Sequence, residues 1–151
     1  MTQAPVRFQR ANYIVADLQR SLAFYRDVIG FEVAFEKDSE KTSYSYPVFE
    51  IPKEANMRWA VLSTHDQPRV MALTEVKDAE LAPVPHPRRA AIVLEIADID
   101  GLLARAAAAG AHVYPEETLI TNDGRKGREI GLVDPDGHLV VIYSITGRAD
   151  D

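Results

Sequence analysis

The first half of the chain changes from a strand-like to a helix-like arrangement of apolar positions. Residues 8–15 have a composition typical of a β-strand, and Asp17 follows as a candidate helix N-cap. Apolar side chains then recur at helical spacing, at Leu18, Leu22, Tyr25 and Ile29. Gly30 comes directly after them, where glycine commonly ends a helix. The pattern predicts a strand, a helix and a helix stop.

Four runs rich in β-forming residues follow Gly30. They cover residues 31–35, 42–51, 58–64 and 69–76, and the segments between them contain charged, Pro, Asn or Asp residues typical of turns. We expect a βαβββ unit in which the first of these runs is continuous with the second. A proline-rich linker at residues 81–89 then disfavours both a helix and a central strand.

The second half repeats this order of elements. Residues 90–96 predict a strand, Asp98 is a second candidate N-cap, and the helix that follows ends at Gly110. The two N-cap residues and the two stop glycines align with a gap of one residue. We infer an internal duplication, with a first module at residues 1–80 and a second at residues 90–151.

Composition restricts the classes of function. The 151 residues are 46% hydrophobic and 26% charged, which is typical of one globular domain or two small half-domains. The net charge of −6 argues against nucleic acid as a partner, because like charges repel the phosphate backbone. The absence of cysteine leaves only His and carboxylate side chains as metal ligands. No apolar run approaches the roughly 20 residues that span a bilayer, so we expect a cytoplasmic protein without membrane contact.

Two motifs resemble those of a known superfamily. Residues 17–31, which read DLQRSLAFYRDVIGF, resemble the opening signature of the vicinal oxygen chelate superfamily, the group of glyoxalases, bleomycin-resistance proteins and extradiol dioxygenases. The turn DPDGH at residues 134–138, followed by an apolar strand, resembles its closing signature. The resemblance implies an α+β fold of two tandem βαβββ modules that form a curved sheet around a cleft. It also implies a homodimer.

In many members of that superfamily, His or Glu side chains in the cleft hold a divalent metal. Counted from the two N-cap residues and the closing motif, the corresponding positions are Arg10, Ala91 and Val141, and the last strand of the first half places Met71 at or near the fourth. A guanidinium has no lone pair to donate, and the other three side chains offer neither oxygen nor imidazole. We therefore expect a protein without the family's metal site and without a cofactor.

Strand alternation predicts which side chains face the cleft. Arg10 and Asn12 share one face of the first strand, and Glu95 lies on the equivalent face of the strand at residues 90–96. Arg10 and Glu95 form a candidate charge pair, either structural or in contact with a ligand. On the last two strands we expect Arg128, Ile130 and Leu132 to share the cleft face with Val141. The predicted ligand contacts are Asn12, Tyr44, Tyr46, Trp59, Met71, Arg128, Val141 and Tyr143.

Three functions follow from these residues. The first is sequestration of a small organic molecule without a metal, as in bleomycin resistance, and the net charge favours a cationic ligand at long range. The second is a metal-independent lyase or isomerase, in which Glu95 is the base and Arg10 stabilises an oxyanion. The third, which the residues support least, is a metal-dependent glyoxalase or dioxygenase with relocated ligands.

Overall fold

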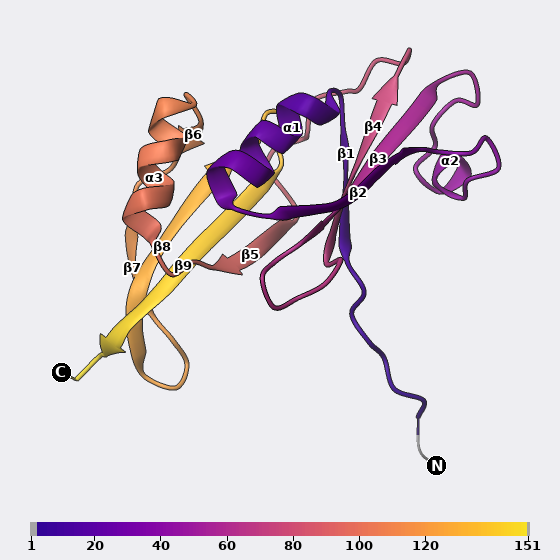
Figure 1. The fold of residues 1–151 in the computed structure, drawn as a ribbon. Helices are drawn as coiled ribbons and strands as arrows, with labels where there is room; N and C mark the ends of the chain where they lie inside the picture. The colour runs from indigo at the N-terminus through magenta and orange to yellow at the C-terminus, as the bar shows by residue number, and fades with distance from the viewer. Residues whose placement is uncertain (1–2, 151) are drawn as a thin grey trace. The chain divides into compact units, whose positions relative to one another are not determined.

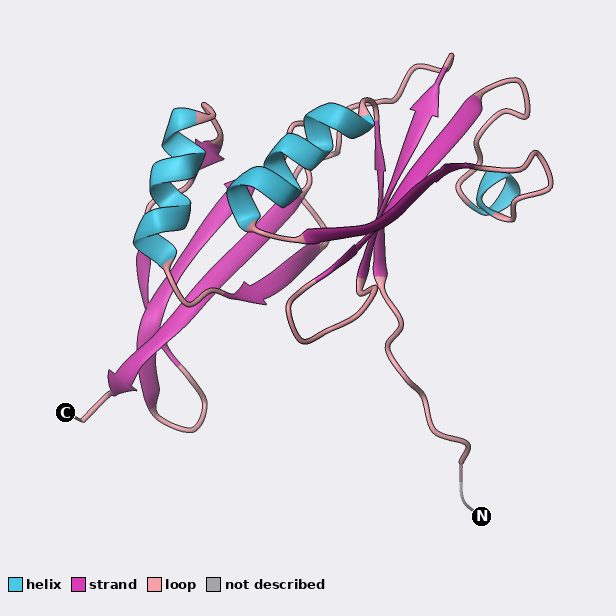
Figure 2. Cartoon of the chain, viewed as in Figure 1, coloured by secondary structure: helices cyan, strands magenta, loops and turns pink. Residues whose placement is uncertain are grey.

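The computed structural model describes residues 3–150, which divide into two compact units. Unit 1 contains the residues up to Leu18 together with Gly30–Glu80, and unit 2 contains Gln19–Ile29 together with the residues from Leu81 onward. Each unit has its own β-sheet (Figure 1 and Figure 2). The predicted α+β fold is confirmed. None of the helices within residues 3–150 has the length and apolar character needed to cross a membrane.

Unit 1 is a four-stranded sheet with the order β1-β4-β3-β2. The strands are β1 (Ala11–Val15), β2 (Glu32–Asp38), β3 (Asn56–Ser63) and β4 (Met71–Lys77). β1 runs parallel to β4, and the other neighbouring strands are antiparallel. The first strand after the helix therefore lies at one edge of the sheet, and β1 lies at the other (Figure 1).

The β-rich run at residues 42–51 is not a strand, and the expectation that it continues the preceding strand is wrong. β2 ends at Asp38, and the segment after it forms turns and the short helix α2 (Ser45–Val48) (Figure 2). Pro47 lies in this helix. Proline has no N–H to donate to a strand ladder, but it is tolerated in the first turn of a helix. The run therefore does not extend the sheet, and of its apolar side chains Tyr46 and Ile51 are buried.

The predicted helix before Gly30 is present in two parts. α1 (Leu18–Phe24) continues directly into η1 (Tyr25–Ile29), which has the wider turn of a π-helix. The N–H of Leu18 donates to Glu75 Oε2 at 2.6 Å. A carboxylate there satisfies a backbone donor and also suits the positive end of the helix dipole. This acceptor comes from β4, 57 residues along the chain, so no local pattern indicates it.

Unit 2 repeats the strand order of unit 1. Its elements are β5 (Ala91–Glu95), α3 (Ile99–Ala108), β6 (His112–Val113), β7 (Glu117–Ile120), β8 (Arg125–Val133) and β9 (Leu139–Arg148). The sheet has the order β5-β9-β8-β6, and β7 also pairs with β8. Asp98 is the N-cap of α3, because its Oδ1 accepts from the N–H of Gly101 at 3.0 Å. The predicted βαβββ pattern of the second half is present, with its second strand divided into β6 and β7.

The core of unit 2 corrects one prediction about strand faces. Ile130 and Leu132 are buried and belong to the core, as do Val140 and Ile142 of β9. In the β8–β9 register, Ile130 pairs with Ile142, whereas Val141 pairs with Gly131. Directly paired residues point to the same face of a sheet. Arg128, Ile130 and Leu132 therefore do not share a face with Val141, and that expectation is wrong.

Candidate functional site

A hollow of about 390 Å³ opens over the sheet of unit 1. Its floor is Ala72 and Thr74 of β4, whose small side chains leave space between the neighbouring strands. Arg10 and Asn12 border the floor on the β1 side, and Trp59 of β3 borders it on the other. The segment between β2 and β3 supplies the remaining wall, at Ser39, Glu40, Thr42, Ser43, Tyr44, Ser45 and Val48.

Sheet register explains why these residues meet. Asn12 pairs with Ala72 across β1 and β4, and Thr74 pairs with Trp59 across β4 and β3. Lys37 of the edge strand β2 pairs in turn with Trp59. Because side chains of paired residues lie on the same face, two adjacent rows of positions build the hollow, one with Asn12 and Ala72 and one with Thr74, Trp59 and Lys37. The alternation of β1 had predicted Arg10 and Asn12 on one face, and both line this hollow.

Two cations reach the single tryptophan of the chain. The guanidinium carbon of Arg10 lies 5.8 Å from the centroid of the Trp59 ring, and Lys37 Nζ lies 5.9 Å from it. The ring of Phe35 also meets Trp59 edge-on at 5.3 Å between centroids. Within residues 3–150, no carboxylate forms an ion pair with Arg10 or Lys37. Both cations therefore make a cation–π contact with Trp59 and no ion pair with a carboxylate.

A side-chain hydrogen bond orients the polar part of the floor. The Thr74 hydroxyl donates to Asn12 Oδ1 at 2.9 Å. This bond occupies the carbonyl oxygen of the Asn12 amide, and its N–H groups remain as donors. Together with Arg10 and Lys37, the floor and its margin present hydrogen-bond donors to the hollow.

Two lysines brace the segment that forms the outer wall. Lys41 Nζ donates to the carbonyl oxygens of Lys53 and Ala55, each at 2.7 Å, and Lys53 Nζ donates to the carbonyl oxygen of Lys41. Both ammonium groups lie over the ring of buried Tyr46, at 5.3 Å for Lys41 and 4.9 Å for Lys53. The Tyr46 hydroxyl donates to the Ala55 carbonyl at 2.8 Å. This network holds the wall next to the sheet.

The predicted ligand contacts of unit 1 separate into two groups. Asn12, Tyr44 and Trp59 line the hollow. Tyr46 lies in the brace just described and not among the lining residues. Met71 is only 1% exposed and lies on the opposite face of β4 from its neighbour Ala72, which lines the hollow.

Sequence reasoning missed Lys37 and Thr74. Lys37 joins the site only through its pairing with Trp59, which no local pattern indicates. Thr74 did carry a weak signal, because it is a polar residue directly after the apolar residues that begin β4. The same signal had drawn attention to Glu95 on β5.

Arg128 lies within an ion-pair network in unit 2. Its guanidinium contacts Glu116 at 2.8 Å and Asp100 of α3 at 3.0 Å. The hydrogen bonds that Arg128 donates to Glu116 and, with a smaller effect, to Asp100 raise the pKa of Arg128 above its usual range, and the bonds from Arg128 lower the pKa of Glu116. The network joins β8 to the first turn of α3. Its geometry is that of a structural network, and a ligand-binding role for Arg128 stays a prediction.

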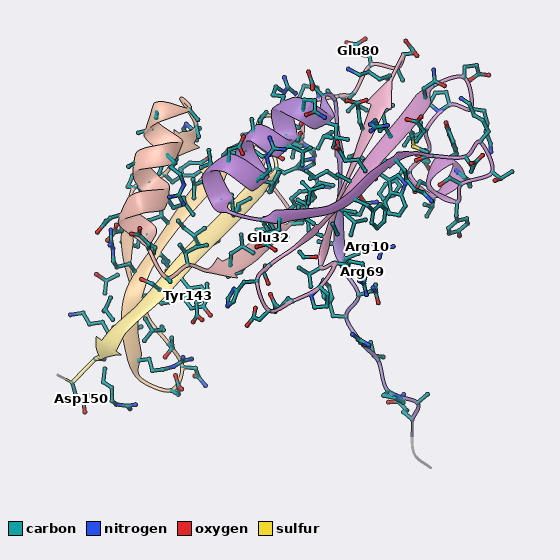
Figure 3. The ribbon with its side chains drawn as sticks, viewed as in Figure 1. Arg10, Glu32, Arg69, Glu80, Tyr143 and Asp150 are labelled. Carbon is teal, nitrogen blue, oxygen red and sulfur yellow. The ribbon has the colours of Figure 1, made fainter. Side chains whose placement is uncertain are left out.

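Glu95, Val141 and Tyr143 lie together on the sheet of unit 2. Glu95 pairs with Tyr143 across β5 and β9, and Val141 pairs with Val93, which is 62% exposed. Figure 3 labels Tyr143, which lies on β9, and Arg10, which lies directly before β1. Arg10 belongs to unit 1 and Glu95 to unit 2, so the charge pair between them stays a prediction.

A second hollow of about 400 Å³ lies in unit 2, beside η1, the end of α3 and the turn at residues 134–138. Its charged groups already have partners. Arg20 contacts Asp136 at 3.2 Å, and Asp134 accepts from the Tyr25 hydroxyl at 2.8 Å and from the N–H groups of Asp136 and His138. Burial raises the pKa of Asp134, and its hydrogen bonds and the charge of His138 oppose that rise. The polar groups of this turn therefore bind to one another and to residues 20 and 25 of the helical segment, which is a structural role.

The positions that correspond to the superfamily's metal ligands do not fit a metal. In unit 1 they are Arg10 and Met71. In unit 2 they are Ala91 and Val141. None supplies an oxygen or imidazole donor. Across the described part of the chain, no group of three or more His, Asp or Glu side chains is placed to hold a metal ion.

Solved structures of low sequence identity share this fold. A glyoxalase family protein from Bacillus cereus has a TM-score of 0.74 at 16% identity, over 96% of this chain and 97% of that one. TnmS3, an antibiotic-binding protein from Streptomyces sp. CB03234, has a TM-score of 0.58 at 20% identity, over 96% and 100%. FosX, a fosfomycin resistance protein from Listeria monocytogenes crystallised with Mn(II) and a dihydroxypropylphosphonic acid, has a TM-score of 0.59 at 18% identity, over 91% of each chain.

Sequence comparison gives the family. No curated protein matches the chain. A family model does match, over residues 7–142, which include both repeats and both motifs. With the repeated strand order of the two units, this match shows that the chain belongs to the Glyoxalase/Bleomycin resistance protein/Dioxygenase superfamily.

Proposed function

We propose that this protein binds a small organic molecule in the hollow of unit 1 without using a metal ion. The observation that carries the proposal is the lining of the hollow, where Trp59 and Tyr44 supply aromatic surface and Arg10 and Asn12 supply unused donors. Ligand sites typically combine apolar walls with a few placed polar groups, in volumes of about 300–1,000 Å³. The volume of about 390 Å³ lies in that range. The antibiotic-binding neighbour TnmS3 supports a binding role by analogy of fold.

Metal independence is part of the same proposal. Arg10 takes the place of a metal ligand and carries a positive charge that repels a divalent cation. We therefore expect ligand binding to be unchanged after exhaustive treatment with EDTA. Loss of binding on chelation, restored by one equivalent of Zn²⁺, Mn²⁺ or Fe²⁺, would contradict the proposal.

The first test compares alanine substitutions of two exposed aromatic residues in the segment between β2 and β3. Tyr44 is 77% exposed and lines the hollow, whereas the nearby Phe49 is 40% exposed and is not among the lining residues. We expect Tyr44→Ala to weaken binding of hits from a fragment collection by about threefold to tenfold, because it removes apolar contact surface. Phe49→Ala is the matched control, with affinity unchanged. Equal effects of the two substitutions, measured by titration of Trp59 fluorescence, would argue against this hollow.

The alternative function, a metal-independent lyase or isomerase, requires Glu95 as a base. Glu95 is exposed on β5, in the other unit from Arg10. Product formation that is abolished by Glu95→Gln while ligand binding is retained would favour the enzyme over the binding protein. Binding without turnover in both forms favours sequestration.

A further inference from the structure

We infer that the hollow of unit 1 selects organic anions, and that Arg10 and Lys37 bind the oxyanion while the apolar part of the ligand lies against Trp59. This inference rests on the proposed function and names its ligand class. It reverses the preference for cations that the net charge of the chain predicts.

Charge at the hollow is the first reason. Arg10 and Lys37 both line it and both reach the same indole ring, at 5.8 Å and 5.9 Å. Glu40 is the single acidic residue among the lining side chains. Cation–π contact with a ring stabilises each charge only weakly at an exposed site. A carboxylate or phosphonate forms stronger, charge-assisted hydrogen bonds, especially with a guanidinium.

Two neutral side chains of the lining also offer hydrogen-bond donors. The Asn12 carbonyl oxygen is occupied by Thr74, which leaves its amide N–H groups as donors. The Ser43 hydroxyl oxygen accepts from the N–H of Ser45 at 3.2 Å, so its proton can be donated elsewhere. Oxyanions accept several hydrogen bonds and donate none, so these donors can bind an oxyanion together with Arg10 and Lys37.

The charge nearest to a bound ligand outweighs the net charge of the whole protein, because electrostatic interactions are screened with distance. The net charge of −6 acts on a ligand over the dimensions of the whole protein, where salt screens it beyond about 8 Å at physiological ionic strength. Arg10 and Lys37 are exposed side chains, but they line the hollow and act on a ligand there at contact distance, which is shorter than this screening length. We therefore expect the bound state to be governed by these two cations.

The experiment uses three probes of nearly equal size: 3-phenylpropionate, 3-phenylpropanamide and 3-phenylpropylamine. Trp59 is the only tryptophan, so its fluorescence reports directly on the hollow. We expect the carboxylate to bind the full chain at least about tenfold more tightly than the amide, and the amine to bind more weakly than the amide. Protein-observed NMR of the backbone amides of residues 10–12 and 72–74 confirms the location.

Matched variants test the roles of the charges. Arg10→Gln is expected to weaken the carboxylate about tenfold or more and the amide by less than twofold, and Lys37→Gln is expected to have a smaller effect in the same direction. Arg58→Gln is the control, because Arg58 precedes Trp59 on β3, faces the opposite side of the sheet and pairs with Asp38 at 2.9 Å. Glu40→Gln is expected to keep or increase the affinity for the carboxylate.

The outcomes separate this inference from the proposed function. Tighter binding of the amine than of the carboxylate, weakened by Glu40→Gln, overturns the anion preference and leaves a ligand-binding hollow. Equal binding of all three probes likewise overturns the anion preference and leaves a ligand-binding hollow. If none of the probes binds and a fragment collection also leaves Trp59 fluorescence and the NMR spectrum unchanged, both proposals fail. Circular dichroism and the melting temperature of each variant show whether the fold is retained.

Discussion

The Asp134 carboxylate shows how a single buried side chain connects distant parts of the sequence. It is 4% exposed and accepts from the Tyr25 hydroxyl, 109 residues earlier in the chain, and from two backbone N–H groups in its own turn. Burial raises its pKa, which the hydrogen bonds only partly offset. The turn motif is recognisable in sequence, but the tyrosine that completes it is not.

The raised pKa of Asp134 predicts a pH dependence of stability. A carboxyl whose pKa is higher in the folded state binds its proton more tightly there. Its contribution is therefore largest below the unfolded pKa and is lost as pH rises through the folded pKa. We expect the free energy of unfolding of the natural protein, minus that of the Asp134→Asn variant, to fall as the pH rises above about 4, the ordinary pKa of an Asp carboxyl, in urea titrations. A difference that stays constant or increases with pH would contradict this account.

At the scale of elements, the pairing of β8 with β9 depends on glycine. A Cβ on Gly127 would lie 2.0 Å from the backbone oxygen of Ser144 on β9, whereas a Cβ on Gly131 would lie 3.3 Å from the movable ring of Tyr114. The register shift between Lys126 and Gly127 lies at the same place. Close approach of two backbones, rather than an unusual backbone angle, therefore requires glycine at position 127.

Gly127→Ala tests this requirement. We expect it to destabilise the protein by about 1–3 kcal/mol, because the backbone of β9 has to shift to admit the methyl group. Gly131→Ala, on the same strand, is expected to cost less than about 1 kcal/mol, because a side chain can adjust. Both values come from urea denaturation followed by circular dichroism. Equal losses of stability in the two variants would show that contact with β9 is not the cause.

The elements also show which parts of the fold are local properties of the sequence. The helix before Gly30, the Asp98 cap and the face of β1 that carries Arg10 and Asn12 follow from spacing within one segment. The conformation of residues 42–51 and the register of β8 against β9 do not follow from local spacing. Both depend on pairing with another strand, and β-propensity alone does not show whether a partner strand is present or in which register it pairs.

At the scale of the whole molecule, the compact units differ from the two halves of the repeat. Residues 19–29 precede the second strand of the first module, but they pack within unit 2. There the Tyr25 hydroxyl bonds to Asp134, and Arg105 Nε donates to the Val28 carbonyl at 3.1 Å. A helical segment of this length is marginal in isolation and gains its stability from tertiary packing.

A chain ending at residue 80 tests that dependence. It keeps residues 19–29 but lacks every partner that they contact in unit 2. We expect the backbone amides of residues 19–29 to exchange with solvent within about tenfold of the rate of an unstructured peptide, whereas the same amides in the full chain are protected. Hydrogen exchange followed by NMR measures both. Protection of these amides in the shorter chain would show that the helix is stable without unit 2.

The sequence by itself determined the repeated βαβββ pattern, the helices that end before Gly30 and Gly110, the family motifs and the lack of metal-ligand side chains at Arg10, Met71, Ala91 and Val141. These properties depend on residue type and on spacing within one segment, which are visible in a single chain. Only the tertiary structure decided that Lys37 and Thr74 join Arg10, Asn12 and Trp59 in one hollow. Strand order and register bring them together, and these are set by packing between segments that lie far apart in sequence. The charge that a ligand meets is therefore a property of the folded sheet rather than of the composition.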